Sequence, residues 1–137
     1  MLRRQFFEVA IGSVAATAIG GRASSATRSE GAAFKAARRF RKTFFGKIAY
    51  VDRGQGDAAL FLHGFPLNSF QWRGAIDRLS AHRRCIAPDF LGLGYTEIPE
   101  AQSCAPDAQV AMLATLLEEL SIPSVDIVAN DSGGAVA

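Results

Sequence analysis

The sequence has little cysteine, little histidine and almost no excess of charge. Its two cysteines, Cys85 and Cys104, lie in no metal-binding spacing, so we expect two separate thiols and no metal site. Lysine and arginine number 15 against 13 aspartates and glutamates, and the resulting net charge of +2 gives no basis for a nucleic-acid partner. Only His63 and His82 are available for histidine-dependent chemistry.

The N-terminal region lacks an apolar run long enough to cross a membrane. The run over residues 9–19 is shorter than the roughly 20 residues that a span needs, so we expect no stable membrane anchor. It follows the motif RRQFF at residues 3–7, which resembles the twin-arginine export motif, and it precedes small residues suited to cleavage near Ala26. We therefore predict a twin-arginine signal peptide over residues 1–26. This implies the twin-arginine export machinery as a partner and a periplasmic or secreted bacterial protein; the alternatives are a basic tail or a misassigned start codon.

The remaining chain alternates strand and helix patterns. Residues 27–43 form a basic leader without regularly spaced aromatics, which indicates a solvated approach to the first strand. Strands are predicted over residues 46–52, 58–62, 84–87 and 125–129, and helices after Asn68 and over 106–120. The alternation indicates βαβ units, one domain over residues 44–137 and an α/β fold with a mostly parallel sheet.

Each predicted helix has an apolar stripe. Asn68 is the expected N-cap of the first helix, with Gln71 completing a capping box. The expected buried residues are Trp72, Ile76 and Leu79 in the first helix, and Val110, Leu113, Leu117 and Leu120 in the second.

The last stretch, residues 124–137, is typical of a nucleophile elbow, a sharp strand-to-helix turn that exposes one reactive side chain. Such a turn needs small residues two before and two after the nucleophile. If Asp131 is the nucleophile, these are Ala129 and Gly133. If Ser132 is the nucleophile, they are Asn130 and Gly134. Asparagine is bulkier than the turn prefers, so we favour Asp131. Asp131 as an ordinary helix N-cap would leave the paired glycines unexplained.

Three motifs in order resemble the N-terminal half of the α/β-hydrolase superfamily: LHGFP at residues 62–66, PDFLGLGYT at 88–96, and the elbow. The resemblance implies a partial α/β-hydrolase fold, a mostly parallel sheet with flanking helices that ends after the elbow. It implies an oxyanion hole from the backbone N–H groups of Phe65 and Ser132. The active-site turns would contain His63, Gly64, Pro66, Gly133 and Gly134. The loop after Asp89 would be structural, with Thr96 where the family usually has serine.

The choice of nucleophile decides the chemistry that the resemblance implies. An aspartate would attack a carbon–halogen bond or an epoxide and form an alkyl-enzyme ester. HGFP is similar to epoxide hydrolases and fluoroacetate dehalogenases. Ser132 replaces the tryptophan usual in haloalkane dehalogenases, which speaks against haloalkanes. A Ser132 nucleophile would instead give a serine esterase or lipase-like enzyme.

The family's catalytic histidine and later acid come near the end of a longer chain, so we expect this chain to be an incomplete hydrolase, inactive alone. Its expected partner is a small-molecule substrate, and no metal or organic cofactor is expected. The remaining alternative is a non-catalytic exported binding protein with a hydrolase-like half-fold.

Overall fold

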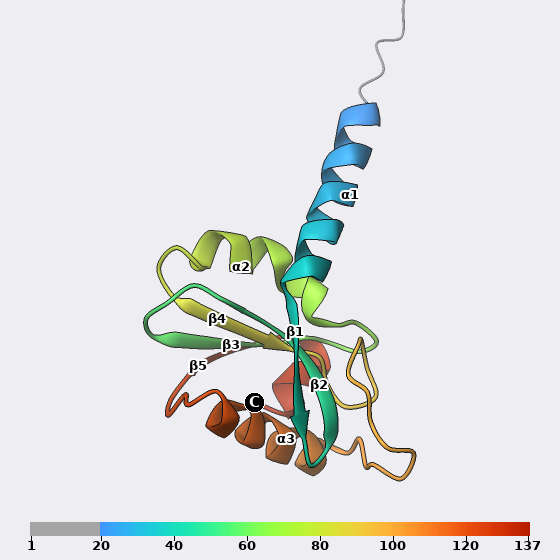
Figure 1. The fold of residues 1–137 in the computed structure, drawn as a ribbon, viewed down its shortest axis with the longest axis vertical. Coiled ribbons are helices and arrows are strands. Elements are labelled where there is room, and N and C mark those ends of the chain that lie inside the picture. Colours follow the sequence, from blue (N-terminus) through green and yellow to red (C-terminus); the bar gives the residue numbers. More distant parts are fainter. Residues whose placement is uncertain (1–19) are drawn as a thin grey trace, which may run out of the picture.

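The computed structural model describes residues 20–137, so the twin-arginine motif lies outside the described residues, and the predicted cleavage position Ala26 lies within the first helix. Five strands form one sheet in the order β1-β2-β4-β3-β5 (Figure 1). The elements in chain order are α1 Gly20–Ala37, β1 Arg38–Thr43, β2 Gly46–Arg53, β3 Ala58–Leu62, the 3₁₀ helix η1 Ser69–Trp72, α2 Arg73–Leu79, β4 Arg84–Pro88, α3 Pro106–Glu119, β5 Asp126–Ala129 and the 3₁₀ helix η2 Asp131–Ala135.

The sheet is mixed. β3 runs parallel to both of its neighbours, β4 and β5, as the α/β pattern predicts. β1 and β2 are antiparallel to each other, and β2 is antiparallel to β4. Only Phe44 and Phe45 join β1 to β2, and a parallel pair would need a crossover of about a dozen residues or more. The expected parallel arrangement therefore holds for β3, β4 and β5 and not for the first two strands.

The sequence pattern does not predict β1, because its sequence RRFRKT is mostly charged. Pairing with β2 explains the strand, since every residue from Arg38 to Thr43 has a partner in register. The guanidinium of Arg38 also lies 3.6 Å from the ring centroid of Tyr95. The basic segment 27–43 thus forms the end of α1 and the whole of an edge strand.

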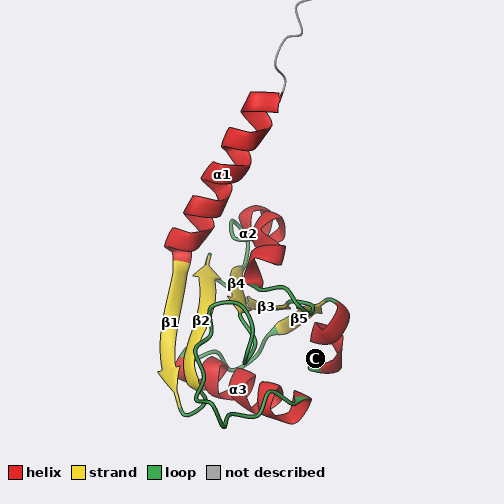
Figure 2. Cartoon of the chain, turned by 90° about the vertical axis from the view of Figure 1, so that its right-hand side faces the viewer, coloured by secondary structure: helices red, strands yellow, loops and turns green. Residues whose placement is uncertain are grey.

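Two apolar layers cover the faces of the sheet, with α2 and α3 on opposite sides (Figures 1 and 2). Alternate strand residues point to each layer, as the two-residue period of a strand requires. The α3 layer contains Ile48, Tyr50, Leu60, Leu62, Ile86, Met112, Leu113 and Leu116. The α2 layer contains Phe34 of α1, Val51, Ala59, Phe61, Ile76, Cys85 and Ala87.

The buried stripe of α3 differs from the predicted one. Its buried residues are Gln109, Met112, Leu113 and Leu116, whereas Val110 is 49% exposed. The Gln109 side chain accepts a hydrogen bond from the Leu91 N–H at 2.9 Å and donates one to the Leu91 carbonyl at 3.1 Å. These bonds satisfy a polar side chain in the interior, so the helix turns this residue inward. A pattern of apolar residues alone selects Val110 instead.

Asn68 caps the helical segment after β3, as predicted, by accepting a hydrogen bond from the Phe70 N–H at 2.9 Å. The segment begins as η1 and continues as α2, in which Ile76 is fully buried. Leu79 is 38% exposed, so its predicted burial is wrong: it lies in the last turn before the chain leaves the helix. Gln71 forms no capping box and bonds to the turn after β3 instead.

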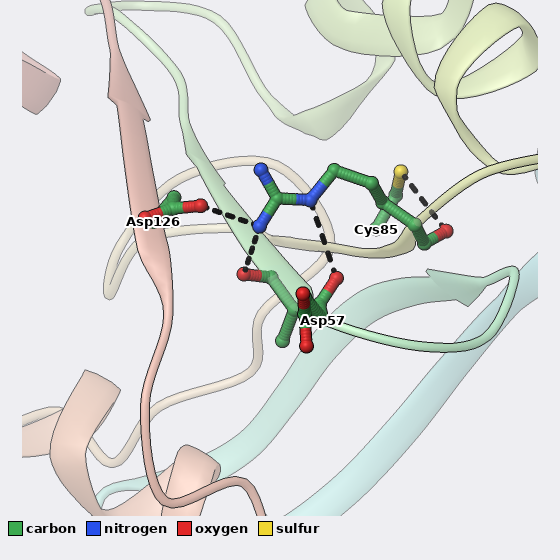
Figure 3. Close-up of polar contacts among 5 residues, drawn as sticks. Asp57, Cys85 and Asp126 are labelled. Carbon is green, nitrogen blue, oxygen red and sulfur yellow. Dashed lines mark hydrogen bonds and ion pairs between the residues drawn. The ribbon is translucent and has the colours of Figure 1, made fainter.

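An ion pair and two hydrogen bonds from Arg83 hold the start of β5 against the start of β3. The Arg83 guanidinium donates to the Asp126 carboxylate at 2.5 Å and to the backbone carbonyls of Asp57 and Ala58, both at 3.3 Å. Asp57 and Asp126 lie on two sides of this guanidinium in Figure 3. Cys85 is buried, with its Sγ 3.8 Å from the Arg83 backbone carbonyl, and Cys104 is exposed; both thiols are free, as predicted. Burial raises the pKa of the Cys85 thiol, against the smaller opposing effects of Arg83 and Arg53.

Candidate active site

The backbone turns sharply at Asp131, directly after β5. Its φ is +50°, in the left-handed region that residues with a side chain rarely adopt, and such a residue costs about 1–3 kcal/mol. In the described part of the chain, Ser121 is the only other non-glycine residue with a positive φ. The tight turn of the predicted elbow is therefore centred on Asp131 and not on Ser132.

The two glycines after Asp131 have different surroundings. A Cβ atom on Gly133 would lie 2.6 Å from the Leu62 carbonyl oxygen and 2.9 Å from that of His63, closer than real Cβ atoms come. A Cβ on Gly134 would meet nothing within 4 Å. The elbow thus needs a glycine two residues after Asp131, and it does not need the glycine two residues after Ser132.

The turn after β3 faces the elbow. The backbone N–H of Phe65 donates a hydrogen bond to Oδ2 of Asp131 at 3.1 Å, across 66 positions of sequence. Gly64 allows this approach, because a Cβ there would lie 3.0 Å from Oδ2. Pro66 follows through a cis peptide bond. The structure therefore brings together the two predicted turns, one offering a backbone donor and the other a carboxylate.

His63 is fully buried, and both of its ring nitrogens have partners. Nδ1 lies 2.9 Å from the Gly64 carbonyl oxygen, and Nε2 accepts the Phe90 N–H at 3.0 Å. Burial lowers the pKa of His63 below its usual 6.5, while the hydrogen bond to Gly64 and the charge of Asp89 act in the opposite direction. The lowered pKa favours the neutral ring, and His63 lies in the turn after β3.

His82 lies at the other end of the sheet. It is exposed in the turn before β4, at the amino ends of the parallel strands, whereas Asp131 follows the carboxyl end of β5. Neither histidine of the chain is therefore placed to activate water at Asp131.

The loop after β4 is held by Asp89, which is fully buried. Its carboxylate accepts the N–H groups of Ser69 and Tyr95, both at 2.8 Å, and its carbonyl accepts the Thr96 hydroxyl at 2.7 Å. Gly94 lies so close that a Cβ would come within 2.3 Å of Oδ2 of Asp89. These contacts tie the loop to η1, and they agree with a structural part for this motif.

An apolar cavity of about 390 Å³ opens beside the elbow. Ser132, which is half-buried, lies on its wall together with the exposed Phe65. None of its lining residues is charged; they are Phe65, Phe90, Leu91, Gly92, Leu93, Cys104, Pro106, Gln109, Ser132, Ala135 and Val136. A neutral, apolar group fits such a lining better than a charged one.

Two polar residues hold the backbone at this site without a signal in the sequence that marks this role. Gln71 accepts the Gly64 N–H at 3.0 Å, and Gln109 holds the backbone of Leu91. The only signal for Gln71 was its spacing from Asn68, which suggested a cap, and nothing marked Gln109.

Within residues 20–137, no group of three or more histidine, cysteine, aspartate or glutamate residues is arranged to hold a metal. The helices described for this chain include none that is both long and apolar enough to cross a membrane.

Comparison with known proteins places this geometry in a family. A model of the alpha/beta hydrolase fold matches residues 58–137. The chain is 40% identical over 91 residues to a haloalkane dehalogenase from Mesorhizobium japonicum, a match that covers 66% of this chain and 29% of that protein. It is 37% identical over 89 residues to the 2-hydroxy-6-oxo-2,4-heptadienoate hydrolase of Pseudomonas putida, covering 63% and 32% of the two chains.

The fold agrees with these matches. The crystal structure of an epoxide hydrolase from Vigna radiata superposes with a TM-score of 0.65 at 34% identity, over 74% of this chain and 33% of that one. The chain thus spans about a third of the length of the relatives it matches. Elbow, facing turn, sheet order and family match agree, and the chain belongs to the α/β-hydrolase fold family.

Proposed function

We propose that this chain carries the nucleophile of a hydrolase in which Asp131 attacks a carbon atom bearing a halide or an epoxide oxygen. The observation that supports it best is the strained backbone of Asp131 together with the Phe65 N–H bonded to its Oδ2. Strain of this kind persists where the surroundings enforce it, which is common at reactive residues. Relatives of this chain are named haloalkane dehalogenase and soluble epoxide hydrolase, and these names match the two leaving groups of the proposal.

The proposed reaction begins at Oδ1 of Asp131, because Oδ2 is already bonded to the Phe65 N–H. Oδ1 forms a bond to the substrate carbon while the carbon–halogen or carbon–oxygen bond breaks. A halide leaves with the electron pair; an epoxide oxygen keeps the pair and takes a proton from water. Oδ2 becomes the carbonyl oxygen of an alkyl ester. When water later adds to that ester, negative charge develops on Oδ2, where the Phe65 N–H stabilises it.

The hydrolysis of that ester needs a base that His63 and His82 do not supply, since one is buried with both nitrogens bonded and the other lies at the far end of the sheet. The residues of this chain therefore account for alkylation and for the oxyanion donor. The proposal extends to the whole enzyme: it completes the hydrolysis of the ester, and its substrate carries a halide or an epoxide.

Ser132 as the nucleophile of an esterase is the competing function. It would require the tight turn one residue later, with a closely packed position 134. The open space around Gly134 and the positive φ of Asp131 favour the aspartate.

Intact-mass spectrometry of the chain with styrene oxide or 1-bromobutane tests the choice. We expect one added mass, located on Asp131 by peptide mapping, which persists in Ser132→Ala and disappears in Asp131→Asn. Asparagine tolerates a positive φ, so the second variant keeps the turn. A fluorophosphonate adduct on Ser132 without any adduct on Asp131 would establish the esterase instead. Absence of both adducts would favour the non-catalytic binding protein.

Export by the twin-arginine machinery is a second, separate proposal, which rests on the motif at residues 3–7. Cleavage after Ala26 would leave residues 27–37 of α1 on the mature protein. Fractionation of a bacterial host expressing the chain tests it. We expect mature protein in the periplasm, and retention of uncleaved protein in the cytoplasm when Arg3 and Arg4 are both replaced by lysine. If the unaltered chain and the variant with both arginines replaced are distributed equally between periplasm and cytoplasm, the predicted signal is wrong.

A further inference from the structure

One peptide group connects the buried His63 to the nucleophile. The carbonyl of Gly64 and the N–H of Phe65 belong to the same peptide, which is rigid and planar. The N–H end donates to Oδ2 of Asp131 at 3.1 Å. The carbonyl end accepts the Leu67 N–H at 2.9 Å and lies 2.9 Å from Nδ1 of His63. Because the two ends of a trans peptide point in opposite directions, holding the carbonyl aims the N–H.

His63 is held so that only one tautomer fits its partners. Nε2 faces the N–H of Phe90, which can only donate, so Nε2 must accept and cannot carry a proton. The proton of the neutral ring is then on Nδ1, where it is donated to the Gly64 carbonyl. The ring centroid lies 4.6 Å from that of Phe90, and the side chain is fully buried, so the ring has no room to turn.

The neighbouring peptide is also fixed, but away from the nucleophile. The N–H of Gly64 donates to Oε1 of Gln71 at 3.0 Å. Of the two successive N–H groups in this turn, only that of Phe65 is bonded to Asp131. The direction of a single donor is therefore set by side chains that never touch the carboxylate.

We propose that His63 is a positioning residue for the alkylation at Asp131: as the Nδ1-protonated neutral ring, it aims the Phe65 N–H at Oδ2 and thereby leaves Oδ1 as the attacking oxygen. The inference rests on the proposed function for its catalytic consequence. The aiming itself is a property of the turn and can be measured without any reaction. A histidine that merely fills the core would leave the direction of the Phe65 N–H unchanged when replaced by a residue that packs equally well.

Two variants of similar shape separate these possibilities. In His63→Asn, the side-chain amide can still donate near the position of Nδ1 but leaves the Phe90 N–H without a partner. In His63→Gln, the longer side chain reaches the position of Nε2 and leaves the Gly64 carbonyl with the Leu67 N–H as its one remaining donor. A structural role predicts the same behaviour for both, whereas the positioning role predicts that asparagine preserves the aim better than glutamine.

The measurements are the amide proton shift of Phe65 by NMR and the rate at which styrene oxide adds to Asp131. Asp131→Ala provides the shift of an unbonded Phe65 amide. We expect His63→Gln to move the shift most of the way to that value and to slow the addition by about tenfold, because the carboxylate is no longer held with Oδ1 free to attack and a misplaced reacting group can cost about 10²-fold in rate. His63→Asn should change both the Phe65 shift and the rate of addition less than His63→Gln does. Equal effects in two folded variants would overturn the inference.

A measurement on the unaltered chain covers the case in which a variant fails to fold. The nitrogen shifts of His63 should show a protonated Nδ1 and an unprotonated Nε2, and the opposite tautomer would overturn the inference. The failures are also distinguishable. If styrene oxide does not label Asp131 in the unaltered chain, the proposed function is wrong, while the Phe65 shift still decides the part of His63. If labelling occurs but the Phe65 amide shift is the same in the His63 variants as in the unaltered chain, only the inference is wrong.

Discussion

The two turns that meet at Asp131 differ in how they are held. The turn after β3 follows a strand whose last four residues are buried, and the peptide groups around Gly64 are bonded to His63, Gln71 and Leu67. The elbow follows β5, in which all four residues are exposed. Ile127 and Val128 of this edge strand are 48% and 37% exposed.

The elbow takes its geometry from the end of β3 and the turn that follows it. The Asn130 N–H donates to the Leu62 carbonyl at 3.2 Å, Gly133 packs against that same carbonyl, and Phe65 binds the carboxylate. Each of these contacts ends on the last residue of β3 or on the turn that follows it. The comparison teaches that the reactive residue is positioned by a segment almost 70 residues away in sequence. Damage to that segment, or to Asp89, whose carboxylate holds the Ser69 N–H just beyond it, should therefore have the largest effects.

Removing the Asp89 carboxylate should be the most damaging change. Asp89→Ala leaves the buried N–H of Ser69 and the partly buried N–H of Tyr95 without acceptors. A buried group of this kind costs about 1–3 kcal/mol and a partly buried one costs less, so we expect a loss of about 3 kcal/mol in the free energy of unfolding, measured by urea denaturation. Glu100→Ala, an exposed acid on the same loop, is the control and should change little. A loss below about 1 kcal/mol for Asp89→Ala would mean that water replaces the carboxylate.

Substitutions at the adjacent Gly133 and Gly134 test how closely the elbow packs against the end of β3. Gly133→Ala puts a methyl group against the backbone of the buried turn, and we expect a loss of about 2 kcal/mol and slower labelling of Asp131. Gly134→Ala enters open space and should stay within about 0.5 kcal/mol. Urea denaturation and the styrene oxide assay measure both. The reverse order would move the centre of the elbow to Ser132.

Acid should weaken the buried turn through His63. Because burial lowers the pKa of His63 in the folded chain, the unfolded chain binds more protons, and stability falls as the pH drops below about 6.5. The slope cannot exceed about 1.4 kcal/mol per pH unit for one group. Asp89 is the charged neighbour that opposes this effect. Urea denaturation from pH 7 to 5 should show a smaller slope in His63→Asn; identical slopes would mean that His63 does not titrate in this range.

A change on the exposed strand should have the smallest effect on stability. Ile127→Lys adds a charge to an edge strand at a half-exposed position, and we expect a change within about 0.5 kcal/mol. Charged residues on edge strands reduce pairing between chains, so light scattering at high protein concentration should decrease. A loss above about 1.5 kcal/mol would show that this side chain is buried in solution, for instance against a second copy.

The sequence by itself determined the parts whose signals are local. The apolar runs of β3, β4 and β5, the cap at Asn68, and each of the three motifs are set by residues within a few positions of one another. The spacing of small residues also favoured Asp131 over Ser132 for the same local reason, since a tight turn excludes bulk beside the nucleophile.

The tertiary structure decided what depends on partners far along the chain. β1 is a strand because β2 pairs with it, although its residues are mostly charged. Gln109 turns inward because the Leu91 backbone needs both of its hydrogen bonds, and Gln71 bonds to Gly64 instead of capping its helix. The bond from Phe65 to Asp131 crosses 66 positions. No periodicity encodes such contacts, because a buried polar group is satisfied by whatever the fold brings beside it.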